Sequence, residues 1–204
     1  MASGVRALRC LFVGGALALC SGCALLSKAR PLSPRYFSPV EGELRAPVAP
    51  AAALELRLGQ VEASAQLEER IAYRTSEAEL GYYESWRWTE PPQVYLRRAL
   101  SRELFERRGF TRVVSGVAPT LDIELVSFEE IRDRPPRARV EIRISLRGER
   151  HMLLERSLRL EHPIASGNED DAPLRLTKAL SLALEDAVTE VADEVAKRLA
   201  APGD

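Results

Sequence analysis

The sequence RVEIRISLRGERHMLLERSLRL, residues 139–160, decides the fold class of this chain. On each side of Gly148, apolar residues alternate with charged or polar ones. The alternating apolar positions are Val140, Ile142, Ile144 and Leu146 before the glycine, and Leu154, Leu158 and Leu160 after it. A period of two predicts strands that are buried on one face only. The segment 148–150 between them predicts a hairpin turn, so one face of the sheet is expected to be apolar and the other charged.

The same alternation predicts further strands on the amino-terminal side of this hairpin. One is marked by Leu54, Leu56 and Leu58, and another by Leu121, Ile123 and Leu125. Shorter apolar runs at 71–73 and 80–83 predict two more short strands.

A first helix is predicted to start at Pro91 and Pro92, because the first helical turn leaves its backbone donors unpaired and therefore tolerates proline. Thr89 is its expected cap, and Gly109 is expected just past its end. Its apolar stripe has the spacing i, i+4, i+8 and consists of Leu96, Leu100 and Leu104.

A long second helix is predicted to close the chain, capped by Asp170 or Asp171 and with Pro173 in its first turn. Its apolar face consists of Leu180, Leu184, Ala187, Val188, Val191, Val195 and Leu199. We expect both helical stripes to pack in the core rather than dock on a partner helix. The patterns together predict one α/β domain over residues 53–204: a mixed, largely antiparallel sheet with strands in local hairpins and two main helices packed on it.

Residues 1–22 are typical of a bacterial export signal. Arg6 and Arg9 precede an uncharged apolar stretch, 11–20, that is shorter than the roughly 20 residues needed to span a bilayer. Ser21-Gly22-Cys23 resembles the lipobox at which bacterial lipoproteins are lipidated and cleaved. Cys20 stands where that motif usually has leucine, so a plain secretory signal or an uncleaved anchor is the alternative. We expect cleavage before Cys23 and a lipid anchor on Cys23.

The segment 23–52 is predicted to be a lipidated tether. Its prolines recur among alanine, serine and glycine, a composition that buries little surface. Tyr36-Phe37 interrupts this composition and is expected to pack locally.

The composition of the mature chain excludes several classes of function. Removing the signal leaves 27 basic against 30 acidic residues, which argues against a nucleic-acid partner. Cys23 is then the last cysteine, so neither an internal disulfide nor a cysteine metal site is possible. His151 and His162 are the only histidines and have no ligand cluster around them. No hydrolase, phosphate-loop or zinc motif is present, so we expect no enzyme activity, no metal and no cofactor.

Aromatic residues are concentrated in the window 71–95. It contains Tyr73, Tyr82, Tyr83, Trp86, Trp88 and Tyr95, with Arg74 and Arg87 among them. These rings fill the core, or form a binding surface, since Trp, Tyr and Arg are enriched in interface hot spots. We expect the window to divide between the two roles, because alternate residues along a strand face opposite ways. The residues assigned to partner binding are Tyr73, Arg74, Tyr82, Tyr83, Trp86 and Trp88. The alternative docking surface is the charged strand face around Arg139, Arg143 and Arg147.

Three motifs of this window resemble the auxiliary lipoprotein family of ABC transporters. They are Ile71-Ala-Tyr-Arg74, Glu79-Leu-Gly-Tyr-Tyr83 and Trp86-Arg-Trp-Thr-Glu-Pro-Pro92, and the leucine-striped helix follows them. This PqiC-like group is found with MCE-domain lipid transport systems, and the resemblance extends over roughly residues 33–200.

The resemblance implies a fold similar to the amino-terminal domain of TolB and a periplasmic lipoprotein. It implies partners, namely an MCE-domain protein and an ABC permease and ATPase, and a homo-oligomeric ring in some members. Ala24, where an aspartate would favour inner-membrane retention, favours the outer membrane. The alternative function is a structural envelope lipoprotein that assists assembly of an outer-membrane complex.

Overall fold

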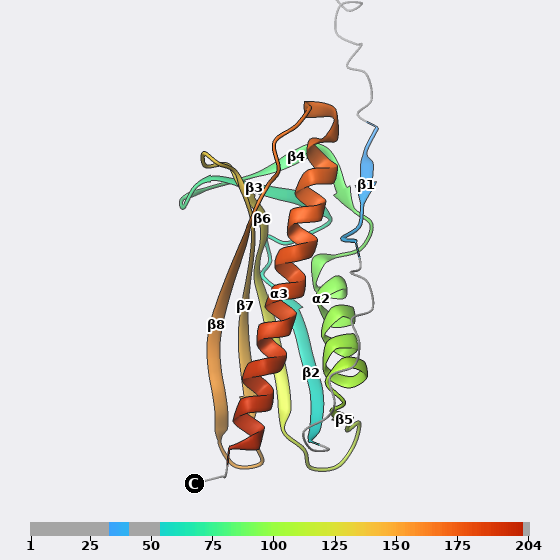
Figure 1. Cartoon of the computed structure of the whole chain (residues 1–204), viewed down its shortest axis with the longest axis vertical. Helices are drawn as coiled ribbons and strands as arrows, with labels where there is room; N and C mark the ends of the chain where they lie inside the picture. Colours follow the sequence, from blue (N-terminus) through green and yellow to red (C-terminus); the bar gives the residue numbers. More distant parts are fainter. Residues whose placement is uncertain (1–32, 41–53, 202–204) are drawn as a thin grey trace, which may run out of the picture. The chain divides into compact units, whose positions relative to one another are not determined.

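A computed structural model of the chain describes residues 33–40 and 54–201 (Figure 1). The predicted signal peptide, Cys23 and most of the predicted tether lie outside these residues. Eight strands form one sheet. Their bounds are β1 Arg35–Phe37, β2 Glu55–Ala63, β3 Arg70–Ser76, β4 Glu79–Trp88, β5 Thr111–Arg112, β6 Thr120–Ile131, β7 Arg137–Arg147 and β8 Met152–Pro163. The helices are α2 Pro92–Ser101, the π-helix η2 Arg102–Arg107, the 3-10 helix η3 Glu169–Asp171 and α3 Ala172–Ala200.

Strand β6 organises the sheet. One of its edges pairs antiparallel with β7, and the other edge is shared by β2 and β3, which both run parallel to it. β2 lies along residues 120–125 and β3 along residues 129–131, so the two behave as one strand with an interruption. The β6–β7 register shifts between Leu125 and Ser127, and there the Gln66 side-chain amide donates to the Val126 carbonyl at 3.1 Å.

The predicted pairing of the strands is confirmed in part. β3–β4, β6–β7 and β7–β8 are antiparallel hairpins, and the turn around Gly148 closes with a 2.9 Å bond from its N–H to the His151 carbonyl. Four other pairs are parallel: β1–β4, β2–β5, β2–β6 and β3–β6. The sheet is therefore mixed, and most of its paired residues lie in the three antiparallel hairpins. The parallel pairs were not predicted, because alternation identifies a strand without identifying its neighbour. The likeness to the TolB amino-terminal domain stays a prediction.

Helix α2 and η2 carry the predicted stripe, and Leu96, Leu100 and Leu104 are fully buried. The predicted cap is wrong: Pro91 is the N-cap residue and no side chain caps the helix. The Thr89 hydroxyl instead lies 2.6 Å from the Ser38 hydroxyl and 2.8 Å from the Tyr95 hydroxyl. Past η2, Gly109 has a φ of 72°, the left-handed conformation for which glycine was predicted at this end.

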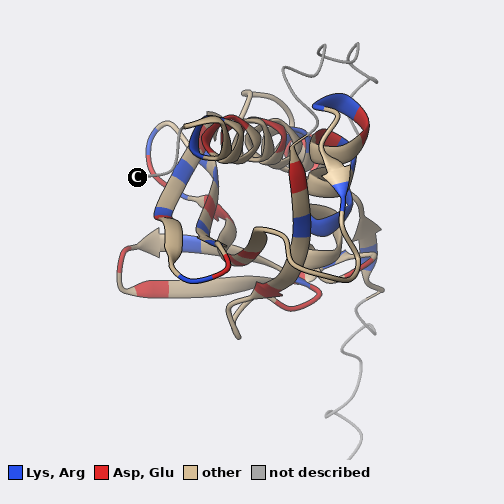
Figure 2. Cartoon of the chain, turned by 90° about the horizontal axis from the view of Figure 1, so that it is seen from below, with Lys and Arg blue, Asp and Glu red and all other residues tan. Residues whose placement is uncertain are grey.

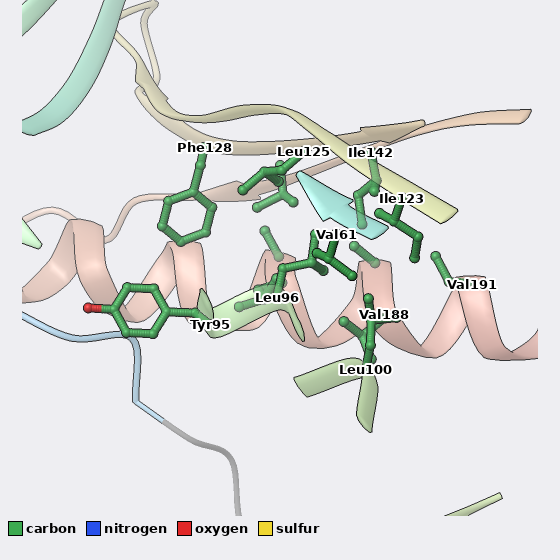
Figure 3. Close-up of a cluster of buried hydrophobic side chains, with 14 of the residues drawn as sticks. Val61, Tyr95, Leu96, Leu100, Ile123, Leu125, Phe128, Ile142, Val188 and Val191 are labelled. Atoms are coloured by element: carbon green, nitrogen blue, oxygen red, sulfur yellow. The ribbon is translucent and has the colours of Figure 1, made fainter. Parts of the chain in front are cut away.

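Helix α3 starts after Asp171, which takes the predicted N-cap position without a side-chain hydrogen bond. The predicted apolar face is buried from Leu180 to Val195, and Leu199 is half-buried. Both helices lie on one face of the sheet (Figure 1), where Phe128, Leu125 and Ile142 of the sheet meet helical side chains (Figure 3). No described helix combines the length and the apolar composition needed to cross a bilayer.

Strand β1 belongs to the segment predicted as tether. It pairs parallel with the end of β4, and Phe37 is buried and packs edge-to-face with Trp86 at 6.3 Å between ring centroids. Tyr36 points away from this contact and is 59% exposed. The local packing expected of Tyr36-Phe37 is therefore confirmed for Phe37. Residues 35–37 of the segment predicted as tether also add a strand to the sheet.

Candidate functional site

The site is a row of aromatic rings on one face of the β3–β4 hairpin. Tyr73 lies directly across from Gly81 in the antiparallel register. A Cβ on Gly81 would lie only 2.5 Å from the Tyr73 ring. Glycine is therefore required here so that the ring can lie flat across the neighbouring strand. Because side chains alternate along a strand, Tyr83 shares this face with Gly81 and Tyr73.

The rings pack against one another in sequence along this face. Tyr73 contacts Tyr83 edge-to-face with 5.3 Å between ring centroids, and Tyr83 stacks on Trp86 at 3.7 Å and 18°. Trp86 in turn packs edge-to-face with Phe37 of β1. Tyr73, Tyr83 and Trp86 are each only half-buried, so parts of all three rings remain accessible.

Arg132, in the loop after β6, covers this row. Its guanidinium carbon lies 3.4 Å from the centre of the Tyr73 ring and 4.8 Å from that of Tyr83, within the range of a cation–π contact. Its Nε donates to Glu130 at 3.2 Å, and the Tyr83 hydroxyl donates to the same carboxylate. Burial, together with the bond to Glu130 and its charge, raises the pKa of Tyr83 well above the ordinary value for tyrosine. The hydroxyl therefore stays protonated at neutral pH and remains a donor.

We call Tyr73, Tyr83, Trp86, Arg132 and Glu130 the aromatic patch. The sequence motifs supplied its three rings, but Arg132 and Glu130 come from about fifty residues further along the chain. No local signal marked them, because a long-range strand pairing, β3 with β6, brings them to this face.

The other residues assigned to partner binding do not belong to the patch. Trp88 is 1% exposed and packs on Phe128 and Tyr95 at 5.1 and 6.2 Å between centroids. Its assignment to a partner surface is wrong, because helix α2 covers its ring. Tyr82 lies on the opposite face of β4, where Arg70 lies 4.2 Å over its ring and its hydroxyl donates to the Gln66 carbonyl at 2.9 Å.

Arg74 belongs to a buried ionic network on that opposite face. Its Nε donates to Glu129 at 3.0 Å, and Glu129 is 1% exposed. Arg139 lies directly across the sheet from Glu129 and binds Glu161 at 2.8 Å. The network connects β3, β6, β7 and β8, which indicates a structural role for Arg74.

The alternative docking surface around three arginines of β7 is an ordered ladder of ion pairs. Arg139 binds Glu161, Arg143 binds Glu124 at 2.5 Å, and Arg147 binds Asp122. Figure 2 shows charges of both signs distributed over the domain. Each of these arginines is thus neutralised by an acid on a neighbouring strand, and the face is not a free basic surface.

The two histidines lie apart from the patch. His151 is exposed at the β7–β8 turn, and His162 Nε2 lies 2.7 Å from Asp186, which connects β8 to α3. Within the described ranges, no group of His, Cys, Asp and Glu is arranged to hold a metal ion.

Comparison with known proteins identifies the family. A family model described as "ABC-type transport auxiliary lipoprotein component" matches residues 39–196. The chain belongs to this family. The auxiliary lipoprotein is therefore a membrane-anchored protein of the cell envelope, and its partners are the components of an ABC-type transport system. The family is one of transport auxiliaries and is not known for enzymatic activity.

Solved structures show that the fold is shared. A Xanthomonas campestris protein of the DUF330 family is 20% identical with a TM-score of 0.68, covering 80% of this chain and 95% of that one. An uncharacterized protein is 17% identical with a TM-score of 0.63, covering 80% and 99%. A hypothetical protein from Chlamydia trachomatis is 13% identical with a TM-score of 0.50, covering 74% and 100%. No curated protein sequence matches the auxiliary lipoprotein.

Proposed function

We propose that the auxiliary lipoprotein docks the MCE-domain subunit of an intermembrane lipid transport system through the aromatic patch. Lipid on Cys23 holds it on the periplasmic side of the outer membrane while it does so. The observation that carries this proposal is the accessible row of Tyr73, Tyr83 and Trp86 beneath Arg132.

The chemistry of the patch suits a protein partner. Tryptophan, tyrosine and arginine are the residue types that dominate interface hot spots. Here the three rings pack on one another, and both Arg132 and Tyr83 are held by Glu130. Side chains that are already ordered lose less entropy on binding, so a larger part of the contact energy appears as affinity.

The position of the patch relative to the anchor also supports docking. Trp86 pairs with Arg35 in β1, close to where the chain enters the sheet. Eleven residue-to-residue steps lead from Cys23 to Pro34, and they extend at most about 40 Å. The lipid anchor therefore lies within roughly that distance of Pro34, next to the strand end that carries Trp86. Ala24 supports the outer membrane as the membrane that holds the anchor.

Trp86→Ala is expected to weaken capture of the MCE partner by about thirtyfold, which corresponds to a hot-spot loss of about 2 kcal/mol. Tyr36→Ala is the matched control, since Tyr36 is an exposed ring on the neighbouring strand and outside the patch. Binding is measured by pull-down from solubilised membranes, and the melting temperature of each variant is measured in parallel. Loss of binding that only follows loss of stability across Tyr73→Ala, Tyr83→Ala and Trp86→Ala would refute patch docking. Capture of an outer-membrane assembly complex in place of an MCE protein would favour the alternative function, a structural envelope lipoprotein that assists assembly of such a complex.

Cys23→Ala is expected to give either a soluble protein or a precursor that keeps its signal peptide, in place of a processed protein in the membrane fraction. The reason is that several acyl chains hold a protein firmly and their loss removes the anchor. Cys20→Ala is the control and should remain in the membrane like the wild type. Fractionation of cells followed by immunoblotting measures both. Retention of the Cys23→Ala protein in the membrane, processed and at wild-type level, would show that the anchor lies elsewhere.

A further inference from the structure

The two most exposed large apolar side chains of the described residues lie in one loop. Val114 is 87% exposed and Val117 is 70% exposed, and both belong to the segment 113–119 between β5 and β6. That segment contains no charged residue. A single exposed valine is ordinary on a protein surface, but two in one uncharged loop indicate a contact with an apolar partner.

The conformation of this loop is fixed by β2. The Val113 N–H donates to the Leu56 carbonyl at 3.0 Å, and the Arg57 N–H donates to the Pro119 carbonyl at 2.8 Å. The Arg57 guanidinium also donates to the carbonyl of Gly116, whose φ of 90° is a left-handed conformation that glycine adopts without strain. The two exposed valines are therefore presented to solvent by a backbone that is held at both ends and in the middle.

The loop shares one end of the domain with two other segments. Thr120, the first residue of β6, pairs with Arg147 at the end of β7, and Arg147 pairs with Met152 at the start of β8. Near the end of α3, the Arg198 Nε donates to the Leu153 carbonyl at 2.7 Å. Figure 1 shows the loop, the β7–β8 turn and the end of α3 together at the lower end of the domain, and Figure 2 views the domain from that end. We call this end the distal tip; it consists of Arg57 and the segments 111–118, 147–152 and 197–200.

Charge also distinguishes the distal tip from the rest of the chain. Its acidic residue is Glu149, and Glu55 of β2 lies beside it. Its basic residues are Arg57, Arg112, Arg147, Arg150, Lys197 and Arg198. One of them, Arg147, is bound to Asp122 of β6, which leaves the tip basic. The whole chain, in contrast, has a net charge of −1. Met152 adds a third exposed apolar side chain to this basic end.

We propose that the distal tip contacts the surface of a lipid bilayer with anionic headgroups, and that Val114 and Val117 enter its apolar boundary. Aliphatic side chains are stabilised at this boundary, and basic residues around them are attracted to anionic headgroups. A protein partner fits this surface less well, because hot spots of protein interfaces are rich in tryptophan and tyrosine and poor in valine. The distal tip contains neither tryptophan nor tyrosine.

The bilayer that holds Cys23 is within reach of the distal tip. β1 pairs with Trp88, and Trp88 packs on Phe128, which lies eight residues along β6 from Thr120. Eight strand residues extend about 26 Å, which is less than the roughly 40 Å that the segment from Cys23 to Pro34 can extend. A second attachment at the tip fixes the orientation of the domain on the membrane, which lipid on a tether alone does not. The lipid on Cys23 belongs to the proposed function, but contact of the tip with a bilayer does not depend on docking through the aromatic patch.

The test uses the full mature chain, reconstituted through its lipid anchor into vesicles of phosphatidylethanolamine and phosphatidylglycerol. Val114→Cys carries a small polarity-sensitive fluorophore. Ser76→Cys is the matched control, because Ser76 is exposed and lies at the opposite end of the sheet, where β3 runs beside the end of β6. We expect blue-shifted emission and quenching by lipid-attached nitroxide at position 114, and emission typical of water at position 76. Equal emission and equal quenching at the two positions would overturn the proposal.

Removal of the second valine tests the apolar contact. In the labelled Val114→Cys chain, Val117→Ser should lower the ratio of inserted to free label by roughly tenfold, because burial of one valine side chain contributes about that factor. Val40→Ser is the control, since Val40 is an exposed valine outside the distal tip. Equal ratios in the two variants would show that Val117 does not enter the bilayer and would overturn the proposal.

Reversal of one charge tests the headgroups. Arg150→Glu should lower the same ratio by roughly threefold to thirtyfold in these vesicles, because it replaces an attracted charge by a repelled one. The control is Lys178→Glu, the same change of charge at an exposed position in the first half of α3. Vesicles of phosphatidylcholine should remove the difference between the two variants. Equal effects of both reversals in the anionic vesicles would refute an anionic bilayer as the partner.

Native membranes distinguish a bilayer from a protein partner. A label at position 114 that stays in water in every vesicle, but is shielded in native membranes, would show that a protein covers the distal tip, and the proposal would be wrong. The vesicles contain no transporter subunit, so failure of this test leaves docking through the aromatic patch unaffected. Loss of MCE capture in the patch variants likewise does not bear on insertion of the tip.

Discussion

Trp88→Ala is expected to lower the free energy of unfolding by about 3–5 kcal/mol, the cost of a cavity left by a large buried aromatic. Trp88 is almost completely buried and contacts Phe128 of β6 and Tyr95 of α2. It therefore joins the sheet to the first helix. Denaturant unfolding followed by circular dichroism measures the loss.

Tyr36→Ala serves again as the control, because its exposed ring should contribute less than about 0.5 kcal/mol to stability. A Trp88→Ala protein as stable as this control would contradict the assignment of Trp88 to the core. The comparison with Trp86→Ala is informative as well. Trp86 is half-buried, so Trp86→Ala should lower the free energy of unfolding less than Trp88→Ala does. It should weaken capture of the MCE partner more.

Glu129→Ala is expected to destabilise the domain by about 3 kcal/mol or more, because removing one partner of a buried pair leaves an uncompensated charge. Glu129 binds Arg74, and buried Arg139 lies directly opposite it in β7. The variant removes the carboxylate that Arg74 binds, while Arg139 keeps its bond to Glu161. The expected effect thus exceeds that of an ordinary ion pair.

Glu124→Ala is the matched control for this experiment. Glu124 lies on the same strand and binds Arg143, but both side chains of that pair are exposed to solvent, 38% and 52%. Exposed pairs contribute about 1 kcal/mol or less, since water already solvates their charges. Chemical denaturation of the two variants compares them directly. Equal losses of unfolding free energy would show that the buried Glu129 network stabilises the domain no more than an exposed ion pair does.

The sequence by itself determined most of the strands, both main helices and the buried face of the longest elements, but it predicted neither β1, which lies in the segment predicted as a tether, nor β5. The alternation of Val140, Ile142, Ile144 and Leu146 and the leucine stripe at 96–104 both predicted buried faces that the structure confirms. These features are local, because a residue's face depends only on its position within a repeating backbone. Gly109 and the turn at Gly148 were predictable for the same reason, since a turn depends on its own few residues.

The family motifs were also readable from sequence, but not the roles of the residues within them. Trp86 and Trp88 are two positions apart on β4 and share a face. Nothing in their local pattern distinguishes them, and both were assigned to partner binding. They differ because α2 places Tyr95 over Trp88, whereas Trp86 lies next to β1 and Tyr83.

Only the tertiary structure decided how the strands are ordered and therefore what the candidate site contains. β2 and β3 both run along β6, a parallel arrangement that no hairpin signal could indicate. That pairing brings Glu130 and Arg132 to Tyr73 and Tyr83. Alternation specifies which face of a strand is buried, but the choice of neighbour depends on packing between residues far apart in the chain. For that reason the rings of the patch were found from sequence, and its charged residues were not.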